Sequence, residues 1–418
     1  MKIIVIGSGL IGISTAYFLS RQGHNVIVLD RQEGPALETS YANGGMATPS
    51  QSEPWNSPGI YKDLLTYLGD EDSPFLLRPR AIFSIIGWGM GFLRNASPAR
   101  FHTNMLKNVR LANYSLNILK NLRRTLEIHY DETSSGTLKY YKSNSQWKRA
   151  IEHSRFYEEM GVSYRLLNSD EVLEVEPALQ NIEKKIVGGI YFPEDESGDA
   201  HKFCLALAAH AKKNGAEFKY GITVLIIEYA AGEITEILTS DGQYKADAYV
   251  LAAGSYSTML AKAVNINLPI RPVKGYSLTL DLSGWVKAPK IPIVDETMHA
   301  AVTPMGGRLR VAGTAEINGY DTEINELRIK TMFKFVTGLF PDDMANIDKD
   351  TVTTWAGLRP YSVDGVPTIS QTSYSNLFLN TGHGHLGWTM SAGSGQLLAD
   401  LINENETAID LSPYSLGR

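Results

Sequence analysis

The chain has 418 residues, of which 43% are hydrophobic and 20% are charged. This length exceeds one ordinary core, and the balance is typical of a soluble globular protein of two domains. The net charge is −6 and the basic residues are scattered, so no basic stripe indicates binding to nucleic acid.

The first thirty residues place a glycine-spaced turn between two apolar strands. The predicted strand 2–6 runs into the turn, a helix follows, and a second strand, 26–29, stops on Asp30. The turn consists of Gly7, Ser8, Gly9, Leu10, Ile11 and Gly12. This spacing in a strand–turn–helix context is the dinucleotide fingerprint, in which the helix N-terminus binds the pyrophosphate. We expect Asp30 to accept hydrogen bonds from a ribose, with Arg31 beside it.

Two segments follow before the next regular helices. Residues 39–60 are rich in Ser, Gly, Asn and Pro, which predicts a long ordered loop that wraps around a ligand. Residues 81–93 are apolar around the whole helical circumference and are flanked by arginines. This segment is shorter than the roughly 20 residues that cross a bilayer. It is therefore either a buried helix or a peripheral membrane contact.

The remaining pattern predicts helices and strands in alternation. The predicted helices are 103–126, 144–161, 201–214, 326–340 and 389–403. The predicted strands are 189–193, 218–228, 234–239, 249–255, 276–282, 299–303, 308–313, 354–357 and 377–379. The single cysteine, Cys204, lies in one of the helices and is expected in the core. One cysteine excludes an internal disulfide and fits a reducing compartment. We read the apolar N-terminus as part of the nucleotide site, not as a signal peptide, and expect the protein on the cytoplasmic side.

The order of these elements defines the predicted fold class. It is α/β, with a Rossmann-type dinucleotide-binding domain and a second, α+β substrate domain built on an antiparallel sheet. The first domain is expected to be discontinuous, from residues 1–60, 195–265 and 350–418. The second is expected from residues 61–194 and 266–349.

Four motifs in this order carry a family resemblance. They are the glycine turn, residues 38–45, residues 250–257, and residues 357–360 together with 382–389. The chain resembles the FAD-dependent D-amino acid oxidase superfamily over essentially its whole length. Residues 274–279 and the last motif resemble its bacterial D-amino acid dehydrogenase branch. The resemblance implies non-covalent FAD between the two domains and oxidative deamination of D-amino acids.

The same resemblance implies which residues bind the cofactor. Besides the glycine turn, Asp30 and Arg31, the implied FAD-binding residues are Thr39, Ser40, Asn43, Gly44, Gly45, Met46, Val224, Ala253, Gly254, Gly384, Gly387, Trp388 and Thr389. Two features depart from relatives. No cysteine is available near the last motif to tether the flavin, and His385 stands where glycine-oxidase-like members carry an arginine.

Three residues are candidates for the chemistry at the substrate. Arg359, in the Gly-Leu-Arg-Pro segment, suits a bidentate grip on the substrate carboxylate, although a structural ion pair is the alternative. Tyr276 offers a hydroxyl to the same carboxylate or is simply packed in its strand. His385 is a candidate for acid–base work or a loop histidine satisfied by hydrogen bonds. No metal ion is needed, because a flavin carries the redox chemistry.

Three functions remain open at this stage. The first is a D-amino acid dehydrogenase that passes electrons to a quinone or respiratory acceptor, with a peripheral inner-membrane contact through residues 81–93. The second is an oxidase of glycine, sarcosine or a related secondary amine that uses dioxygen. The third is a flavin-bearing assembly subunit or an NAD-binding module. The residues do not distinguish oxidase from dehydrogenase, because oxygen reactivity depends on access and charge around the flavin.

Overall fold

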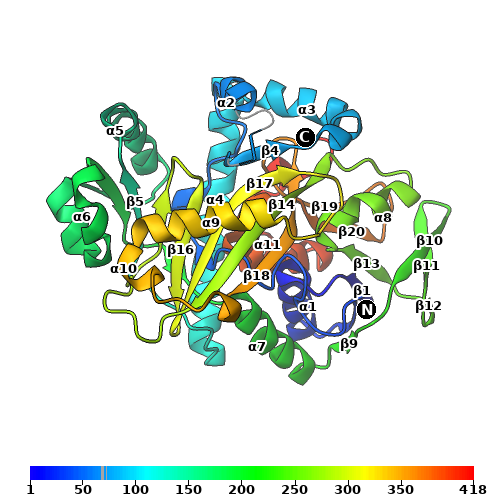
Figure 1. Ribbon diagram of the computed structural model, residues 1–418. Coiled ribbons are helices and arrows are strands. Elements are labelled where there is room, and N and C mark those ends of the chain that lie inside the picture. The colour runs from blue at the N-terminus through cyan, green and yellow to red at the C-terminus, as the bar shows by residue number, and fades with distance from the viewer. Residues whose placement is uncertain (67–69, 72) are drawn as a thin grey trace.

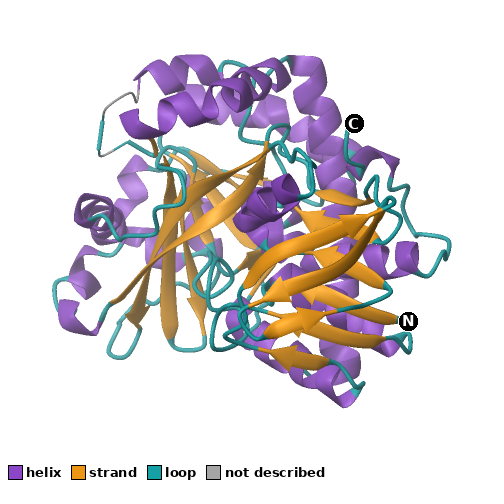
Figure 2. Cartoon of the chain, turned by 90° about the vertical axis from the view of Figure 1, so that its right-hand side faces the viewer, coloured by secondary structure: helices purple, strands orange, loops and turns teal. Residues whose placement is uncertain are grey.

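The computed structural model describes residues 1–66, 70–71 and 73–418 (Figure 1). Within this part of the chain, the strands form a six-stranded sheet, a nine-stranded sheet and two smaller sheets. The two large sheets are separate layers that meet near the middle of the molecule (Figure 2).

The six-stranded sheet has the order β19-β20-β13-β1-β2-β9. Its strands are β1 (Lys2–Ile6), β2 (Asn25–Leu29), β9 (Glu217–Lys219), β13 (Ala248–Leu251), β19 (Thr368–Gln371) and β20 (Leu377–Thr381). The strands from β20 to β9 are parallel, and β19 is an antiparallel edge strand. Both faces of β1 are buried, since Ile3 and Val5 pack on one side and Ile4 and Ile6 on the other.

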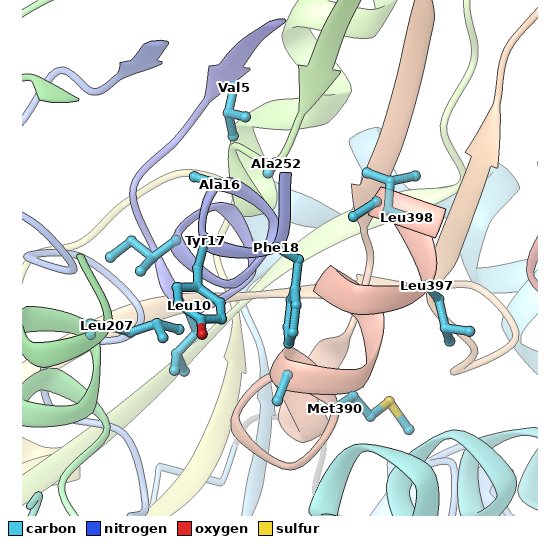
Figure 3. Packing of buried hydrophobic residues seen from close by; sticks show 14 of the residues in the cluster. Val5, Leu10, Ala16, Tyr17, Phe18, Leu207, Ala252, Met390, Leu397 and Leu398 are labelled. Carbon is cyan, nitrogen blue, oxygen red and sulfur yellow. The ribbon is translucent and has the colours of Figure 1, made fainter. Parts of the chain in front are cut away.

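Three helices cover one face of this sheet. They are α1 (Leu10–Arg21), α7 (Ala200–Lys213) and α11 (Gly387–Ile402). Figure 3 shows Tyr17 and Phe18 of α1 among the side chains of this core, with Leu207 of α7 and Met390 of α11. The other face is covered by α8 (Ser257–Ala263) and a small sheet of β10 (Val224–Ala230), β11 (Glu233–Thr239) and β12 (Gly242–Tyr244).

The nine-stranded sheet is mostly antiparallel. Its path is β18 (Thr353–Ser362), β14 (Ile270–Asp281), β17 (Arg308–Ile317), β16 (Ala300–Met305), β15 (Ile293–Asp295), β5 (Thr137–Tyr141), β7 (Gly188–Phe192) and β6 (Arg165–Leu167), with β4 (Phe75–Leu77) beside β17. One face packs on α6 (Ser169–Val175) and α9 (Glu326–Leu339), which α10 (Pro341–Met344) follows. The opposite face turns toward the six-stranded sheet and bears the candidate site.

The other helices frame these layers. They are α2 (Ile60–Thr66), α3 (Ile82–Asn95), α4 (Pro98–Leu126) and α5 (Asn144–Glu159). The short 3-10 helices are η1 (Pro49–Gln51), η2 (Pro79–Ala81), η3 (Pro177–Lys185), η4 (Gly254–Tyr256), η5 (Lys349–Thr351), η6 (Gly384–Leu386) and η7 (Ser412–Tyr414). In the long predicted loop, β3 (Met46–Ala47) pairs with β8 (Glu196–Ser197).

The predicted fold class is confirmed, and two elements cross the expected domain boundaries. Strand β18 lies within 350–418 but belongs to the nine-stranded sheet. Helix α4 lies within 61–194 but packs on α11, where the Gly393 N–H donates to Ser115 Oγ over 3.0 Å. A long helix has several faces to bury, so α4 joins the core of the first sheet.

Residues 81–93 form most of α3. The helix is neither fully buried nor fully exposed, so neither alternative from the sequence, a buried helix or a peripheral membrane contact, describes all of it. Trp88 and Phe92 are buried against Tyr361 and its neighbours. On the other side of the helix, Phe83 is 87% exposed and Met90 is 65% exposed. None of the helices within the described residues is long and apolar enough to span a membrane.

Candidate active site

A cavity of about 980 Å³ lies between the two large sheets. It extends from the glycine turn after β1 to Arg359 on β18, and residues of both layers line it. A volume of this size is at the upper end of the range for ligand and cofactor sites.

The glycine turn shapes one end of the cavity. Gly7 has φ of +107°, and a Cβ there would lie 2.6 Å from the Ala252 carbonyl oxygen. A Cβ on Gly12 would lie 1.9 Å from the Gly7 oxygen, so only glycine permits this approach of strand and helix. Helix α1 begins after Gly9, and the N–H of its first residue, Leu10, donates to Ser40 Oγ over 3.1 Å. The glycine turn and this positive end of the helix line the cavity and suit a phosphate.

Asp30 borders the same end of the cavity and also fixes the turn. Its Oδ2 accepts hydrogen bonds from the Ser8 N–H (2.6 Å) and the Ser8 hydroxyl (2.8 Å), and its Oδ1 accepts from the Gln32 N–H. Arg31 pairs with Glu38 at 2.6 Å and lies 3.7 Å above the Tyr256 ring. Part of the acceptor capacity that we assigned to a ribose is therefore used within the protein.

The predicted wrapping loop is held on the nine-stranded sheet by side chains of that sheet. The Ser277 hydroxyl donates to the Ala42 carbonyl (2.7 Å) and the Thr303 hydroxyl to the Gly44 carbonyl (2.8 Å). A Cβ on Gly45 would lie 2.7 Å from Met305 Sδ, which keeps that position small. The loop backbone from Ala42 to Met46 thus forms a fixed wall of the cavity.

The N-terminal turn of α11 forms the facing wall. Thr389 Oγ1 accepts a hydrogen bond from the Thr48 N–H over 3.0 Å, which joins this turn to the loop. Gly384, Gly387 and Trp388 line the cavity beside it. The positive end of a helix dipole here suits the negative charge that a reduced flavin carries.

Arg359 enters the cavity from β18 and lies over a glycine. A Cβ on Gly275 would come within 2.2 Å of Arg359 Nη1, so the guanidinium occupies the space that a larger residue would take. Nη1 donates to the Thr314 carbonyl over 3.0 Å, and within the described residues no carboxylate pairs with the guanidinium. Burial lowers the Arg359 pKa to about 10, so the group stays cationic at neutral pH.

Of the two roles expected for Tyr276, the structure shows packing in its strand and not a hydroxyl beside Arg359. Its hydroxyl donates to Glu316, so it is engaged away from Arg359. Side chains alternate along a strand, and Tyr276 falls on the opposite face of β14 from Gly275 and Ser277. The hydroxyl therefore supports the charged network behind the sheet.

His385 lines the cavity as a neutral ring. Its Nε2 lies 3.2 Å from the Gln51 carbonyl oxygen, which can only accept, so Nε2 carries the proton. Burial lowers the His385 pKa to about 4. The ring stacks on Trp55 with centroids 5.0 Å apart, and Trp55 stacks in turn on Tyr361 at 4.8 Å. His385 therefore positions an aromatic wall.

Trp55 is a site residue that the sequence analysis missed. It lies in the predicted loop, its ring centroid is 5.5 Å from Arg359 Cζ, and it stacks on both Tyr361 and His385, whose ring centroids are 6.2 Å apart. A single tryptophan in a Ser- and Pro-rich loop was the available signal, because a ring of that size needs a packed neighbour. A charged pair on the cavity wall, Lys139 with Glu296, was also missed.

Most of the predicted cofactor residues line the cavity. Only Ser8 and Gly12 are buried behind the wall and support the turn. The predicted residues that line the cavity are Gly7, Gly9, Leu10, Ile11, Asp30, Arg31, Thr39, Ser40, Asn43, Gly44, Gly45, Met46, Val224, Ala253, Gly254, Gly384, Gly387, Trp388 and Thr389. A glycine cradle, a helix N-terminus and an acid after β2 fit an adenine dinucleotide.

Fold and site together define a dinucleotide-binding enzyme of two layers with a half-buried guanidinium between them. Residues 2–401 match the family described as FAD dependent oxidoreductase, and the chain belongs to that family. Two similar proteins are the D-amino acid dehydrogenases of Allorhizobium ampelinum, 42% identical over 424 residues, and of Sinorhizobium medicae, 42% identical over 418 residues. Each alignment covers 100% of this chain and 100% of the relative. The resemblance noted in the sequence is thereby confirmed.

Solved structures show the same fold. The glycine oxidase of Geobacillus kaustophilus has a TM-score of 0.77 at 23% identity, and that of Bacillus cereus has 0.76 at 24% identity. Both comparisons cover 100% of this chain and 98% of the other. The protein is an FAD-dependent oxidoreductase. The glycine turn, the loop 42–46 and the N-terminal turn of α11 line the cavity and would hold its FAD.

Proposed function

We propose that the protein is a dehydrogenase of D-amino acids. It converts a D-amino acid and an electron acceptor into a 2-oxo acid, ammonia and the reduced acceptor. Bound FAD supplies hydride acceptance at the site. The support comes from the full-length relatives named D-amino acid dehydrogenase and from a cavity in which Arg359, with no carboxylate partner among the described residues, lies beside the residues expected to bind a flavin.

The observation that carries the proposal is the half-buried Arg359, which faces the cavity. A guanidinium without a carboxylate partner among the described residues is costly to bury, unless a ligand supplies the negative charge. A substrate carboxylate does so bidentately and is thereby held in one orientation. Arg359 thus binds and orients the substrate so that its Cα–H points toward the flavin.

His385 and Trp55 complete this end of the cavity in the proposal. Both rings are uncharged at pH 7, and with Arg359 they line the cavity, so a bound ligand there lies against an aromatic surface and displaces water. Exclusion of water strengthens the attraction between the guanidinium and a carboxylate. His385 acts as a positioning residue through Trp55.

We further propose that the electron acceptor is a membrane quinone and that the protein lies on the cytoplasmic face of the inner membrane. One side of α3, with Ile85, Trp88 and Phe92, lines the cavity. The other side exposes a set of apolar residues to solvent, which are Ile82, Phe83, Ile86 and Met90, and the exposed Leu93 lies at the edge of the cavity. The exposed basic residues Arg94 and Arg100 follow, as expected of a helix that lies in a membrane surface. A single helix thus separates the cavity from the proposed membrane contact.

Anaerobic mixing with a panel of D- and L-amino acids tests the substrate. D-amino acids should bleach the flavin absorbance within the turnover time, and their L-enantiomers should not. Bleaching by L-amino acids alone, or by neither, would refute the proposal. Stoichiometric peroxide in an air-saturated assay would instead identify an oxidase.

The acceptor is tested with a charged substitution on α3. Phe83→Glu should preserve the rate with a soluble dye and reduce the rate with ubiquinone in anionic vesicles by about tenfold or more, because a carboxylate opposes insertion. Val286→Glu is the matched control, since Val286 is also 87% exposed but lies on a loop away from α3. Equal quinone rates in both variants would refute the membrane contact.

A further inference from the structure

Thr314 on β17 holds a backbone conformation that its residue type disfavours. Its φ is +57°, in the left-handed region, where a β-branched side chain is an outlier. The side chain is buried and lines the cavity, and its Oγ1 has no hydrogen-bond partner among the described residues. Both features reduce stability, so the neighbouring strands must impose them.

A β-bulge in β17 imposes this conformation. On β14 the single residue Gly275 lies between two paired positions, whereas on β17 two residues, Thr314 and Ala315, lie between the partners of those positions. On the other edge of β17, Ala315 pairs with Phe75 of β4, and the Ala315 N–H donates to the Pro74 carbonyl over 2.8 Å. The bulge is thus fixed from both sides, by β14 and by β4.

The bulge reverses the alternation of side chains along β17. Ala312 lines the cavity before the bulge, and Ile317 lines it afterwards, five residues later. In an uninterrupted strand, residues an even number apart share a face, so Glu316 would lie on the cavity face with Ala312. Glu316 lies instead behind the sheet, where Arg78 Nε donates to one of its oxygens over 2.7 Å and the Tyr276 hydroxyl donates to the other.

This reversal keeps a carboxylate away from Arg359. Without the bulge, the register would set Glu316 opposite Val273, whose neighbour on the other side is Arg359. Adjacent strands lie about 4.8 Å apart, so the two long side chains would flank Val273 on one face, within reach of an ion pair. A guanidinium paired in that way could not take a substrate carboxylate.

The bulge also supplies Arg359 with its acceptor. The Arg359 side chain extends from β18 over Gly275, and its Nη1 donates to the Thr314 carbonyl over 3.0 Å. Thr314 has no partner in the register of β14, so its carbonyl is left to the guanidinium. Within the described residues this is the one hydrogen bond of the Arg359 side chain. The direction of the Thr314 carbonyl therefore sets the direction of the guanidinium.

We propose that Thr314 is a positioning residue for the substrate anchor. Its left-handed backbone orients the Arg359 guanidinium in the cavity and keeps the Glu316 carboxylate out of it, so the cation is oriented and unpaired before a substrate carboxylate arrives. The strain at Thr314 thereby serves substrate binding. The inference rests on the proposed function, because it takes the substrate carboxylate as the ligand of Arg359.

Two substitutions at Thr314 separate the role of the backbone from that of the side chain. Thr314→Ala and Thr314→Gly both remove the unpartnered hydroxyl, but only glycine adopts a φ of +57° without strain and is free to leave it. Binding is measured with propionate, an unreactive analogue of D-alanine, from its perturbation of the flavin spectrum. Thr314→Ala should keep the propionate dissociation constant within about twofold of the wild type, because the Cβ still restricts the backbone.

Thr314→Gly should lose this restriction. Propionate binding should weaken by about fivefold or more, and the KM for D-alanine should rise by a similar factor, because the guanidinium must be ordered on binding. Thr314→Gly should nevertheless unfold at a temperature about 1–3 °C higher than Thr314→Ala, since the left-handed strain is gone.

Ala231→Gly is the matched control. Ala231 has a φ of +51° between β10 and β11, where it is exposed to solvent and lies outside the cavity. Glycine relieves the same kind of strain there, so the unfolding temperature should rise while propionate binding and the KM for D-alanine stay unchanged.

Wild-type propionate binding in Thr314→Gly would overturn the positioning role. Equal weakening in Thr314→Ala and Thr314→Gly would overturn it too, because the hydroxyl and not the backbone would then be required. If Thr314→Gly unfolds at no higher temperature than Thr314→Ala, the strain is absent and the proposal fails. If no D-amino acid bleaches the flavin of the wild type, the proposed function fails, and propionate binding still decides the role of Thr314.

Discussion

The substitution Gly275→Ala should separate substrate binding from stability. The added Cβ would lie 2.2 Å from Arg359 Nη1, 2.3 Å from Cζ and 2.4 Å from Nη2. The guanidinium is the end of a flexible side chain, so it should move by about 1 Å while the strand stays in place. A displacement of that size costs up to about 10²-fold in rate, and a charged hydrogen bond contributes about 1.5–3 kcal/mol. We therefore expect kcat/KM for D-alanine to fall by about 10- to 150-fold.

The free energy of unfolding of Gly275→Ala should change little or increase, while kcat/KM falls. Gly275 lies within an extended strand and does not have positive φ, so alanine is compatible with its backbone. Alanine has fewer backbone conformations than glycine in the unfolded chain, so this substitution in a strand can raise the free energy of unfolding by up to about 1 kcal/mol. Activity should be measured with a soluble dye and stability by thermal unfolding, on protein of equal flavin content. Gly338→Ala in α9, where a Cβ meets open space, is the control that should leave kcat/KM unchanged. A kcat/KM within twofold of the wild type would refute the role of Arg359.

Three further predictions follow from buried positions. Gly12→Ala should abolish flavin absorbance in the purified protein, because its Cβ would lie 1.9 Å from the Gly7 oxygen; normal flavin content would contradict this. Burial lowers the His383 pKa from 6.5 to about 3, so below pH 6.5 the unfolded chain binds a proton that the folded protein does not. The free energy of unfolding should fall by about 1.4 kcal/mol per pH unit from this group as the pH drops below 6.5, and His383→Gln should remove that slope in denaturant titrations. Burial raises the Asp195 pKa from 3.8 to about 7, so the folded protein holds a proton that the unfolded chain releases. The free energy of unfolding of the wild type should therefore fall as the pH rises from about 4 to 7. The free energy of unfolding of Asp195→Asn should not fall in this way, so it should rise relative to the wild type over that pH range. If the difference in free energy of unfolding between Asp195→Asn and the wild type did not change with pH, Asp195 would not have a raised pKa.

Local patterns in the sequence predicted the cofactor end of the site. The glycine turn needs only the spacing of Gly7, Gly9 and Gly12 between two apolar strands, and all of that information lies within thirty residues. Arg359 could be predicted for a similar reason, since glycine and proline flank it and mark a special backbone. The backbone conformation at these positions is determined by residues close to them in the sequence, so a local pattern is enough to predict it.

Other parts of the site depended on pairings that no local pattern reports. The face of Tyr276 depends on the register of β14, and a shift of one residue reverses every side chain. Lys139 and Glu296 meet only because β5 and β15 pair in parallel, although they lie far apart in the chain. The two-sided burial of α3 depends on the tertiary contacts of Trp88 and Phe92, so its composition alone gave two readings.

The strand order of the six-stranded sheet affects when, during synthesis of the chain, the protein can bind its flavin. Strand β1 lies between β2 and β13, and β13 in turn pairs with β20, so partners adjacent in space are synthesised far apart in time. The glycine turn is synthesised more than 370 residues before the opposite wall of the cavity, which extends to Thr389. Capture of the flavin must therefore await translation of nearly all of these residues, and a nascent chain that stalls earlier exposes half a pocket to chaperones and proteases.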